Sequence, residues 1–348
     1  MGTLGIVVVG PGLIGKQHIR LVAARSDCKL LAIVAPEHEA NYAVAREHGV
    51  PLFRDLDECR SLRDIDGAII SSPNQFHAEQ AKWCIDAGVA VLVEKPITAS
   101  VSEGEALVAL AERRNAKVLV GHHRAHSPLL ARAREVIESG RLGRLVSVMG
   151  SAQFYKPADY FEAGPWRTKP GGGPILINLI HEIGNLRSLC GEITAVQAFS
   201  SSTLRRHEVE DTVAINLRFA NGALGNFMLS DTAACARSWE QTSRENPAYP
   251  TYPDEDCYVV AGTRGYLSVP TFRLKYQPGE EEPSWLKPLT EETLEVERQE
   301  PLACQLEHFV QVIRGNAKPL VSASDGLRNL KITEAIARSA AEGRIIET

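Results

Sequence analysis

The segment LGIVVVGPGLIG (residues 4–15) decides the fold. Six apolar residues of strand length run directly into glycines with the spacing G-x-G-x-x-G, and a helical pattern begins within the same segment. After a buried strand, such glycines let backbone N–H groups approach a pyrophosphate at a helix N-terminus. We therefore expect four residues of this turn to bind a dinucleotide: Gly10, Gly12, Leu13 and Ile14.

The rest of the first third repeats the same alternation. Apolar runs occupy residues 29–35, 66–72, 89–96 and 116–123, and helical patterns separate them. Strands without polar alternation, joined by helices, indicate a parallel sheet that is covered on both faces. We predict a doubly wound Rossmann domain over residues 1–123, within an α/β fold class.

The end of the second strand bears on the choice of dinucleotide. Ala35 stands where an acid for the adenosine ribose is expected, and the nearest acid is Glu37. No Arg or Lys lies between Leu31 and Ala45, so His38 is the only basic candidate for a 2′-phosphate. We favour NAD and leave NADP open, because both side chains could also belong to an exposed first helical turn.

Strand-like runs dominate the second part of the chain, at 142–155, 192–201, 211–220, 222–231 and 256–263. Consecutive runs of this kind predict an open, mostly antiparallel sheet. We therefore expect an α+β domain over 124–348 that binds substrate and mediates oligomerisation, with C-terminal helices packing back on the first domain.

One helical segment, GGGPILINLIHEIGN (171–185), carries a narrow polar stripe. Asn178, His181, Glu182 and Asn185 have the spacing of one α-helical face. An ordinary solvent face carries more Lys and Glu, so the stripe is either a sparse solvent face or the wall of a cavity.

Composition limits the classes of function. The chain has 348 residues and a net charge of −5, with no basic cluster, which argues against a nucleic-acid partner. No stretch approaches eighteen apolar residues, and the N-terminus lacks a signal-peptide pattern, so we expect no membrane span. Seven scattered cysteines without CxxC spacing argue against a disulfide framework, and favour a cytoplasmic setting.

Three further motifs complete a resemblance. SSPNQFH (71–77), EKP (94–96) and GGGPILINLIH (171–181), together with the glycine turn, resemble the glucose–fructose oxidoreductase/inositol dehydrogenase/MocA (Gfo/Idh/MocA) family of NAD(P)-dependent oxidoreductases. The resemblance runs from about residue 4 to the end of the chain. It implies a homodimer or homotetramer formed through the free face of the second sheet.

The resemblance also implies site residues around the cofactor. Lys95 is expected to hydrogen-bond the reacting oxygen and to contact the cofactor ribose, and ligands of such sheets bind at the carboxyl ends of the strands. His77 is expected to cap or pack the helix that follows rather than to take part in the reaction. The remaining cofactor contacts are assigned to residues in the two strand-end motifs: Ser72, Pro73, Asn74, His77 and Glu94.

The second part of the chain is expected to supply the substrate wall. His181 has the side chain suited to general acid and base catalysis near neutral pH, and Asn178 is expected to hold substrate or imidazole. Arg124 is expected near the substrate or the nicotinamide carboxamide, with packing of the linker as the alternative. Trp166 and Arg167 are expected to border the substrate, and the alternative is an exposed loop with Arg167 in a surface ion pair. The histidines of GHHRAHSP (121–128) have no acid or cysteine close in sequence, so we predict no metal.

Two positions depart from the family pattern. The aspartate that many members place four residues before the histidine is Ile177 here, and an acid three residues after it is Gly184. Because an amide cannot accept a proton, a proton relay would end at His181 or at water rather than at a carboxylate.

The predicted function is hydride transfer between a nicotinamide and a secondary alcohol or ketone of a sugar, polyol, cyclic diol or related small molecule. Two alternatives remain. The departures above would suit a catalytically silent nucleotide-binding sensor or regulatory subunit, and the same scaffold could reduce a C=N or C=C bond.

Overall fold

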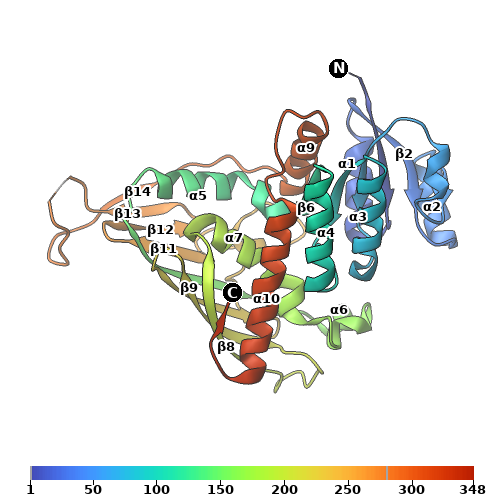
Figure 1. Cartoon of the computed structure of the whole chain (residues 1–348). Helices are drawn as coiled ribbons and strands as arrows, with labels where there is room; N and C mark the ends of the chain where they lie inside the picture. Colours follow the sequence, from blue (N-terminus) through green and yellow to red (C-terminus); the bar gives the residue numbers. More distant parts are fainter. Residues whose placement is uncertain (1, 280) are drawn as a thin grey trace. The chain divides into compact units, whose positions relative to one another are not determined.

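The computed structural model describes residues 2–279 and 281–348, and the chain divides into two compact units. The first unit contains residues 1–126 and 301–330, and the second contains residues 127–300 and 331–348. Figure 1 shows a helix-covered sheet in each unit. The segment 301–330 returns to the first unit, although all strands of the second sheet except the last one lie between it and residue 126 in sequence.

The first unit is built on a six-stranded parallel sheet with the order β3-β2-β1-β4-β5-β6. This confirms the predicted doubly wound arrangement. The edge strand β3 was not predicted because it has only two residues. The strands are β1 (Leu4–Val9), β2 (Cys28–Val34), β3 (Leu52–Phe53), β4 (Ile65–Ile70), β5 (Ala90–Glu94) and β6 (Val118–Gly121).

Helices cover both faces of this sheet. On one face the β1 residues Ile6 and Val8 share a buried cluster with residues of α1, α2 and α9, and on the other face Val7 and Val9 share one with residues of α3 and α4. Continuous apolar strands arise because neither face meets water. The helices are α1 (Leu13–Ala23), α2 (Glu39–Glu47), α3 (His77–Asp86), α4 (Val101–Arg113) and α9 (Pro301–Ile313).

The second unit contains a nine-stranded sheet with the order β14-β13-β12-β11-β7-β10-β9-β8-β15. Strands β7 and β10 pair in parallel, and the other described pairs are antiparallel, as predicted. The strands are β7 (Leu145–Gln153), β8 (Ile193–Ser201), β9 (Thr212–Phe219), β10 (Leu224–Ser230), β11 (Tyr258–Gly262), β12 (Gly265–Val269), β13 (Arg273–Tyr276), β14 (Thr290–Thr293) and β15 (Ile346–Glu347).

Helices cover one face of the second sheet (Figure 1). Leu129, Ile183 and Ile336, each from a different helix, join sheet residues such as Phe227 in one buried cluster. These helices are α5 (Pro128–Glu138), α7 (Ile180–Cys190) and α10 (Ala323–Glu342), and a further short helix is α6 (Ala158–Glu162). None of the helices in the described part of the chain is both long and apolar enough to cross a membrane.

Candidate active site

The glycine turn after β1 has the backbone geometry that its sequence predicts. Gly10 has a φ of +84°, and a Cβ at this position would lie 2.6 Å from the backbone nitrogen of Ser72. A Cβ on Gly15 would lie 1.9 Å from the carbonyl oxygen of Gly10. Only glycine therefore lets the turn pack against the end of β4 and lets α1 start close to the turn.

The N-terminus of α1 is suited to an anionic ligand. Gly12 precedes the helix without a side-chain cap, the first turn has no acidic residue, and a Cβ on Gly12 would meet nothing within 4 Å. Leu13 is 84% exposed beside it. Unsatisfied N–H groups and the positive end of the helix dipole favour a phosphate. The turn thus fits the pyrophosphate of a dinucleotide.

His77 fastens together the two loops at the carboxyl edge of the sheet. Its Nδ1 lies 2.8 Å from the carbonyl oxygen of Pro96, and its Nε2 lies 2.9 Å from that of Ser72. Burial is the largest influence on its pKa, which is lowered. With both ring nitrogens on backbone oxygens, the His77 side chain holds the loops that carry the SSPN and EKP motifs.

A second buried histidine, His18, was not found from the sequence. It lies on α1 and is fully buried, and its Nε2 is 2.9 Å from Oε1 of Glu94 at the end of β5. Burial opposes ionisation of Glu94, but the hydrogen bond from His18 and nearby positive charge lower its pKa. The Glu94 side chain is thus directed at α1. The one available sequence signal is that His18 has the helical spacing of the apolar residues Leu21 and Val22.

Lys95 follows Glu94 directly. Its backbone N–H donates to Oε2 of Glu94 at 3.3 Å, and the peptide bond to Pro96 is cis. Burial is the main cause that lowers the pKa of the Lys95 ammonium, and the charge of Arg124 lowers it further while Glu94 opposes both. A lysine whose charged form is disfavoured can give up a proton more readily than an exposed one.

Glu37 lies just beyond β2 and is exposed. Its Oε1 accepts a hydrogen bond of 2.6 Å from the hydroxyl of Tyr42 on α2, and this bond is the main cause that raises the pKa of Tyr42. The tyrosine holds the carboxylate in place, which the sequence did not indicate. Of the other strand-end residues, Ser72 donates its hydroxyl to Gln80, and Pro73 precedes a short 3₁₀ turn over Asn74–Phe76.

The polar stripe of the second unit differs from the predicted helical face. A π-helical turn, Ile175–Leu179, contains Asn178 and leads into α7. His181, Glu182 and Asn185 are all buried, so the solvent-face interpretation is wrong for these three residues. An inserted π-turn changes the angular relation between Asn178 and the residues after it.

Glu182 and Asn185 are anchored to the sheet by one tyrosine. The Tyr258 hydroxyl, fully buried on β11, donates to Oε2 of Glu182 and accepts from Nδ2 of Asn185 at 2.9 Å. These two members of the stripe thereby fix α7 on the sheet, which is a supporting role. Asn178 and His181 are the members left as candidates for chemistry.

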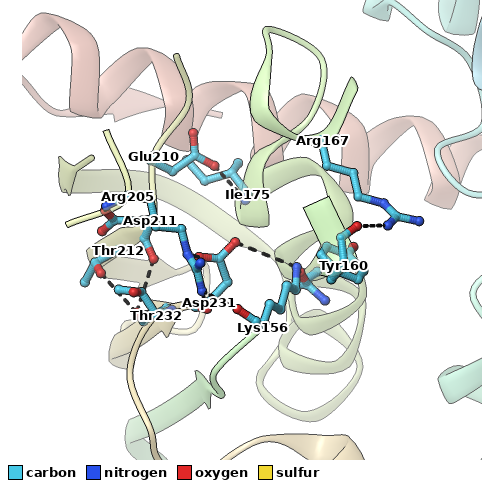
Figure 2. A network of polar contacts seen from close by, with 12 residues as sticks. Lys156, Tyr160, Arg167, Ile175, Arg205, Glu210, Asp211, Thr212, Asp231 and Thr232 are labelled. Carbon is cyan, nitrogen blue, oxygen red and sulfur yellow. Dashed lines mark hydrogen bonds and ion pairs between the residues drawn. The ribbon is translucent and has the colours of Figure 1, made fainter. Parts of the chain in front are cut away.

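Lys156 approaches Asn178 and was not predicted. Its Nζ donates to Oδ1 of Asn178 at 2.7 Å and lies 3.9 Å from Oδ2 of Asp231. Asp231 also accepts a bond of 2.8 Å from Nε of Arg205 (Figure 2). Lys156 follows β7 in the sequence YKPAD, a loop without any motif that distinguishes it from a surface lysine.

The glycines before the π-turn allow close approach of other parts of the same unit. A Cβ on Gly172 would lie 2.7 Å from the carbonyl oxygens of Trp166 and Arg167, and one on Gly173 would lie 2.6 Å from Oε1 of Glu210. The loop with Trp166 and Arg167 therefore packs against the start of the segment that carries Asn178. Arg167 stacks on Tyr160 with its guanidinium carbon 4.0 Å from the ring centre.

Glu210 closes the start of the π-turn. Its Oε1 accepts a hydrogen bond of 2.8 Å from the backbone nitrogen of Ile175 (Figure 2). Burial is the largest influence on the Glu210 carboxyl and raises its pKa, although the bond from Ile175 opposes this. This N-terminus is thus satisfied by the chain itself.

Two family models match the chain in succession. Residues 4–122 match the model described as "Oxidoreductase family, NAD-binding Rossmann fold", and residues 130–268 match "GFO/IDH/MocA C-terminal domain". The chain belongs to the Gfo/Idh/MocA oxidoreductase family. The resemblance drawn from four short motifs is thereby confirmed.

Relatives within the Gfo/Idh/MocA family align over nearly the whole chain. An inositol 2-dehydrogenase of Rhizobium meliloti (strain 1021) is 26% identical over 99% of both chains, and a 1,5-anhydro-D-fructose reductase of Ensifer adhaerens is 24% identical over 98% of this chain and 97% of its own. A solved structure of a putative myo-inositol dehydrogenase from Sinorhizobium meliloti 1021 has 25% identity and a TM-score of 0.76, with 99% of both chains covered.

Membership in the Gfo/Idh/MocA family fixes the class of protein. The first unit is its NAD-binding Rossmann domain, and the chain is an enzyme of a family of dehydrogenases and reductases that act on sugars and polyols. The open N-terminus of α1 agrees with the predicted nicotinamide dinucleotide.

Proposed function

We propose that this protein transfers hydride between NAD and a secondary alcohol or ketone of a sugar, polyol, cyclic diol or related small molecule. The observation that carries the proposal is the position of Lys95 directly after β5, at the carboxyl edge that also holds the glycine turn. In this class of sheet that edge binds the cofactor and places reacting groups beside it.

Lys95 is proposed to polarise the reacting oxygen. An alkoxide develops on that oxygen during hydride transfer, and a nearby ammonium group stabilises the negative charge. The lowered pKa of Lys95 makes its proton easier to share with the oxygen. His77, which ties the loop at Pro96 to the loop at Ser72, keeps the lysine loop in position.

His181 is proposed to remove or return the hydroxyl proton, because imidazole titrates near neutral pH. Asn178 is proposed to hold the substrate, and Arg124, Trp166 and Arg167 to border it. The nicotinamide, when bound, accepts or supplies the hydride. Glu37, held by Tyr42, is proposed to bind the adenosine ribose, which favours NAD over NADP because a carboxylate repels a 2′-phosphate.

A cofactor and substrate screen tests this proposal. Purified protein is assayed with NAD and NADP against myo-inositol, scyllo-inositol, 1,5-anhydro-D-fructose and levoglucosan, with absorbance at the nicotinamide band as the readout. We expect Lys95→Ala and His181→Ala each to lower kcat by about a hundredfold or more, the usual range for a general acid or base. Lys29→Ala and His48→Ala serve as matched controls, and both should keep wild-type kcat.

Three outcomes contradict the proposal in different ways. Tight NAD binding without turnover of any compound favours the silent sensor. Reduction of imines or enones without oxidation of alcohols favours the C=N or C=C reductase. Turnover that survives both Lys95→Ala and His181→Ala leaves the reaction class standing but removes the assigned residues.

We further propose that two or four copies assemble through the uncovered face of the second sheet. Exposed fractions of 55% for Met149, 70% for Phe199, 60% for Leu224 and 38% for Met228 describe an apolar surface. Phe199, Ala214 and Met228 lie in one row across three paired strands.

Light scattering tests this assembly and should give the mass of a dimer or tetramer for the wild type. The double variant Phe199→Glu with Met149→Glu should give monomers. Leu286→Glu, at another exposed position, is the control, and a monomeric wild type would contradict this proposal.

A further inference from the structure

Lys156 is a buried cation whose side chain points at an amide. It is 7% exposed, and its Nζ lies over the rings of Tyr160 and Phe154, 4.8 Å and 5.3 Å from their centres. The same Nζ also donates a hydrogen bond of 2.7 Å to Oδ1 of Asn178. A lysine is seldom buried unless polar groups satisfy its charge, so the amide oxygen is part of what holds it there.

The backbone of Lys156 is fixed by a separate set of bonds. Its N–H donates to the carbonyl oxygen of Asp231 at 2.9 Å, and its own carbonyl oxygen accepts from Arg205 at 2.7 Å. Arg205 also bonds the Asp231 carboxylate, which lies near Nζ (Figure 2). The backbone of Lys156 therefore cannot move away from Asn178 without breaking these hydrogen bonds.

The contact decides which way the amide of Asn178 is turned. An ammonium group has three donors and no acceptor, so it can face only the oxygen of an amide and never the NH₂ group. Oδ1 is consequently directed at Lys156, and the two N–H donors of Asn178 are directed elsewhere. This assignment follows from the chemistry of lysine and does not depend on telling oxygen from nitrogen by position.

We infer that Lys156 is a positioning residue that holds Asn178 as a hydrogen-bond donor, so that this position selects a substrate bearing an acceptor oxygen such as a carbonyl, a carboxylate or a ring oxygen. The inference rests on the proposed function in so far as Asn178 is taken to meet the substrate. An aspartate at 178 would keep the contact with Lys156 but would offer the substrate only acceptors.

Selective ¹⁵N labelling of asparagine tests the contact without any substrate. The side-chain amide signals of Asn178 are identified by their loss in Asn178→Asp. We expect Lys156→Met to shift them, because the amide oxygen then loses a charged donor, and Lys156→Arg to keep them close to the wild-type position. Lys287→Met, an exposed lysine of the same unit, is the control. Unchanged signals in Lys156→Met would overturn the inference, whatever the enzyme turns over.

A double-mutant cycle on a turned-over substrate tests the selection. Lys156→Met and Asn178→Ala should each lower kcat/KM by about ten- to a hundredfold, which is the value of a hydrogen bond near a charge, while KM for NAD stays unchanged. If Lys156 acts through Asn178, the double variant is no worse than Asn178→Ala. Additive losses, or an Asn178→Asp variant as active on ketone substrates as the wild type, would also overturn it.

The two experiments separate two kinds of failure. A wild type that turns over none of the compounds counts against the proposed function, while the labelled amide still decides how Asn178 is held. If Lys156→Met melts well below the wild type, Lys156→Arg and Asn178→Asp carry the test. Full activity in Lys156→Arg with a large loss in Asn178→Asp is the pattern expected of donor positioning.

Discussion

Two glycine-rich segments of this chain lead into helices, yet they end in opposite states. Before α1, Gly12 leaves the first helical N–H groups uncapped, and nothing lies within 4 Å of a Cβ built there. Before the π-turn, a Cβ on Gly173 would strike the Glu210 carboxylate, which accepts from the nitrogen of Ile175. The N-terminus of α1 is therefore open to an anionic ligand, whereas the N-terminus of the π-turn is occupied by the Glu210 carboxylate.

The comparison shows that glycines before a helix do not by themselves identify a phosphate site. What distinguishes the two segments is whether an acidic side chain from elsewhere in the fold reaches the N-terminus. Glu210 lies 35 residues from Ile175 in sequence, so local sequence reading cannot detect it. Both helix starts nevertheless obey the same rule, because their unsatisfied N–H groups need an acceptor.

The largest expected effect comes from removing the contact between His18 and Glu94, which supports α1. His18→Leu leaves the buried Glu94 carboxylate without its hydrogen-bond partner on α1, and an unsatisfied buried acceptor costs about 1–3 kcal/mol, with charged groups at the upper end. We expect urea unfolding to show a loss in that range. His48→Leu is the control. A loss below about 1 kcal/mol, within the range of a surface change, would show that the pair does not support α1.

A smaller effect is expected from placing a side chain at Gly12, at the uncapped N-terminus of α1. Gly12→Val places a side chain where no protein atom lies, so the unfolding midpoint should stay near the wild-type value. The Kd for NAD should rise by about ten- to a hundredfold, the equivalent of one or two charge-assisted hydrogen bonds. Calorimetric titration with NAD measures it. Wild-type affinity in Gly12→Val would mean that the dinucleotide does not approach this turn.

Removing the Glu210 carboxylate from the N-terminus of the π-turn should lower the free energy of unfolding by less than His18→Leu does. Glu210→Ala removes the acceptor of the Ile175 N–H, and loss of a helix cap costs about 0.5–2 kcal/mol. Glu210→Gln keeps an acceptor of the same shape and should retain most of the stability in urea unfolding. If both variants were equally unstable, the carboxylate would act through its charge and not as a cap.

The smallest expected effect is a change with pH in the stability that the contact between Glu210 and the Ile175 N–H provides. Burial raises the pKa of the Glu210 carboxyl above its usual 4.5, so the folded protein keeps this proton to a higher pH than the unfolded chain. The stability that comes from this protonation is fully present below 4.5 and is lost as the pH rises through the folded pKa. The wild type should therefore lose stability relative to Glu210→Gln over that interval. A flat or rising difference would contradict the assigned direction.

Most of the fold could be predicted because its signals are local. Apolar runs such as Leu4–Val9 alternate with helices in a way that only a covered parallel sheet satisfies, and a strand end fixes where Gly12 and Lys95 lie. Strand β3 escaped prediction because two residues at a sheet edge have no periodicity of their own.

The supporting residues of the site could not be predicted because their partners are distant in sequence. His18 and Glu94 are 76 residues apart, as are Glu182 and Tyr258, and Lys156 is 22 residues from Asn178. A single buried His or Lys is indistinguishable from a surface residue until the fold brings its partner close. The π-turn likewise has no signal in Ile175–Leu179, which reads as ordinary helix.

That π-turn has a consequence for how the family's helix can vary in length. A π-turn holds one residue more than an α-turn, so a single amino acid can be gained or lost there while the rest of the helix stays in register. Deleting Ile177 should restore a regular helix and turn the residues before the deletion, such as Ile175, by about 100° relative to His181, which is one residue's step around the axis. A one-codon deletion at this point would therefore redirect the Ile175 N–H away from Glu210 without disturbing Tyr258 or the core beneath α7.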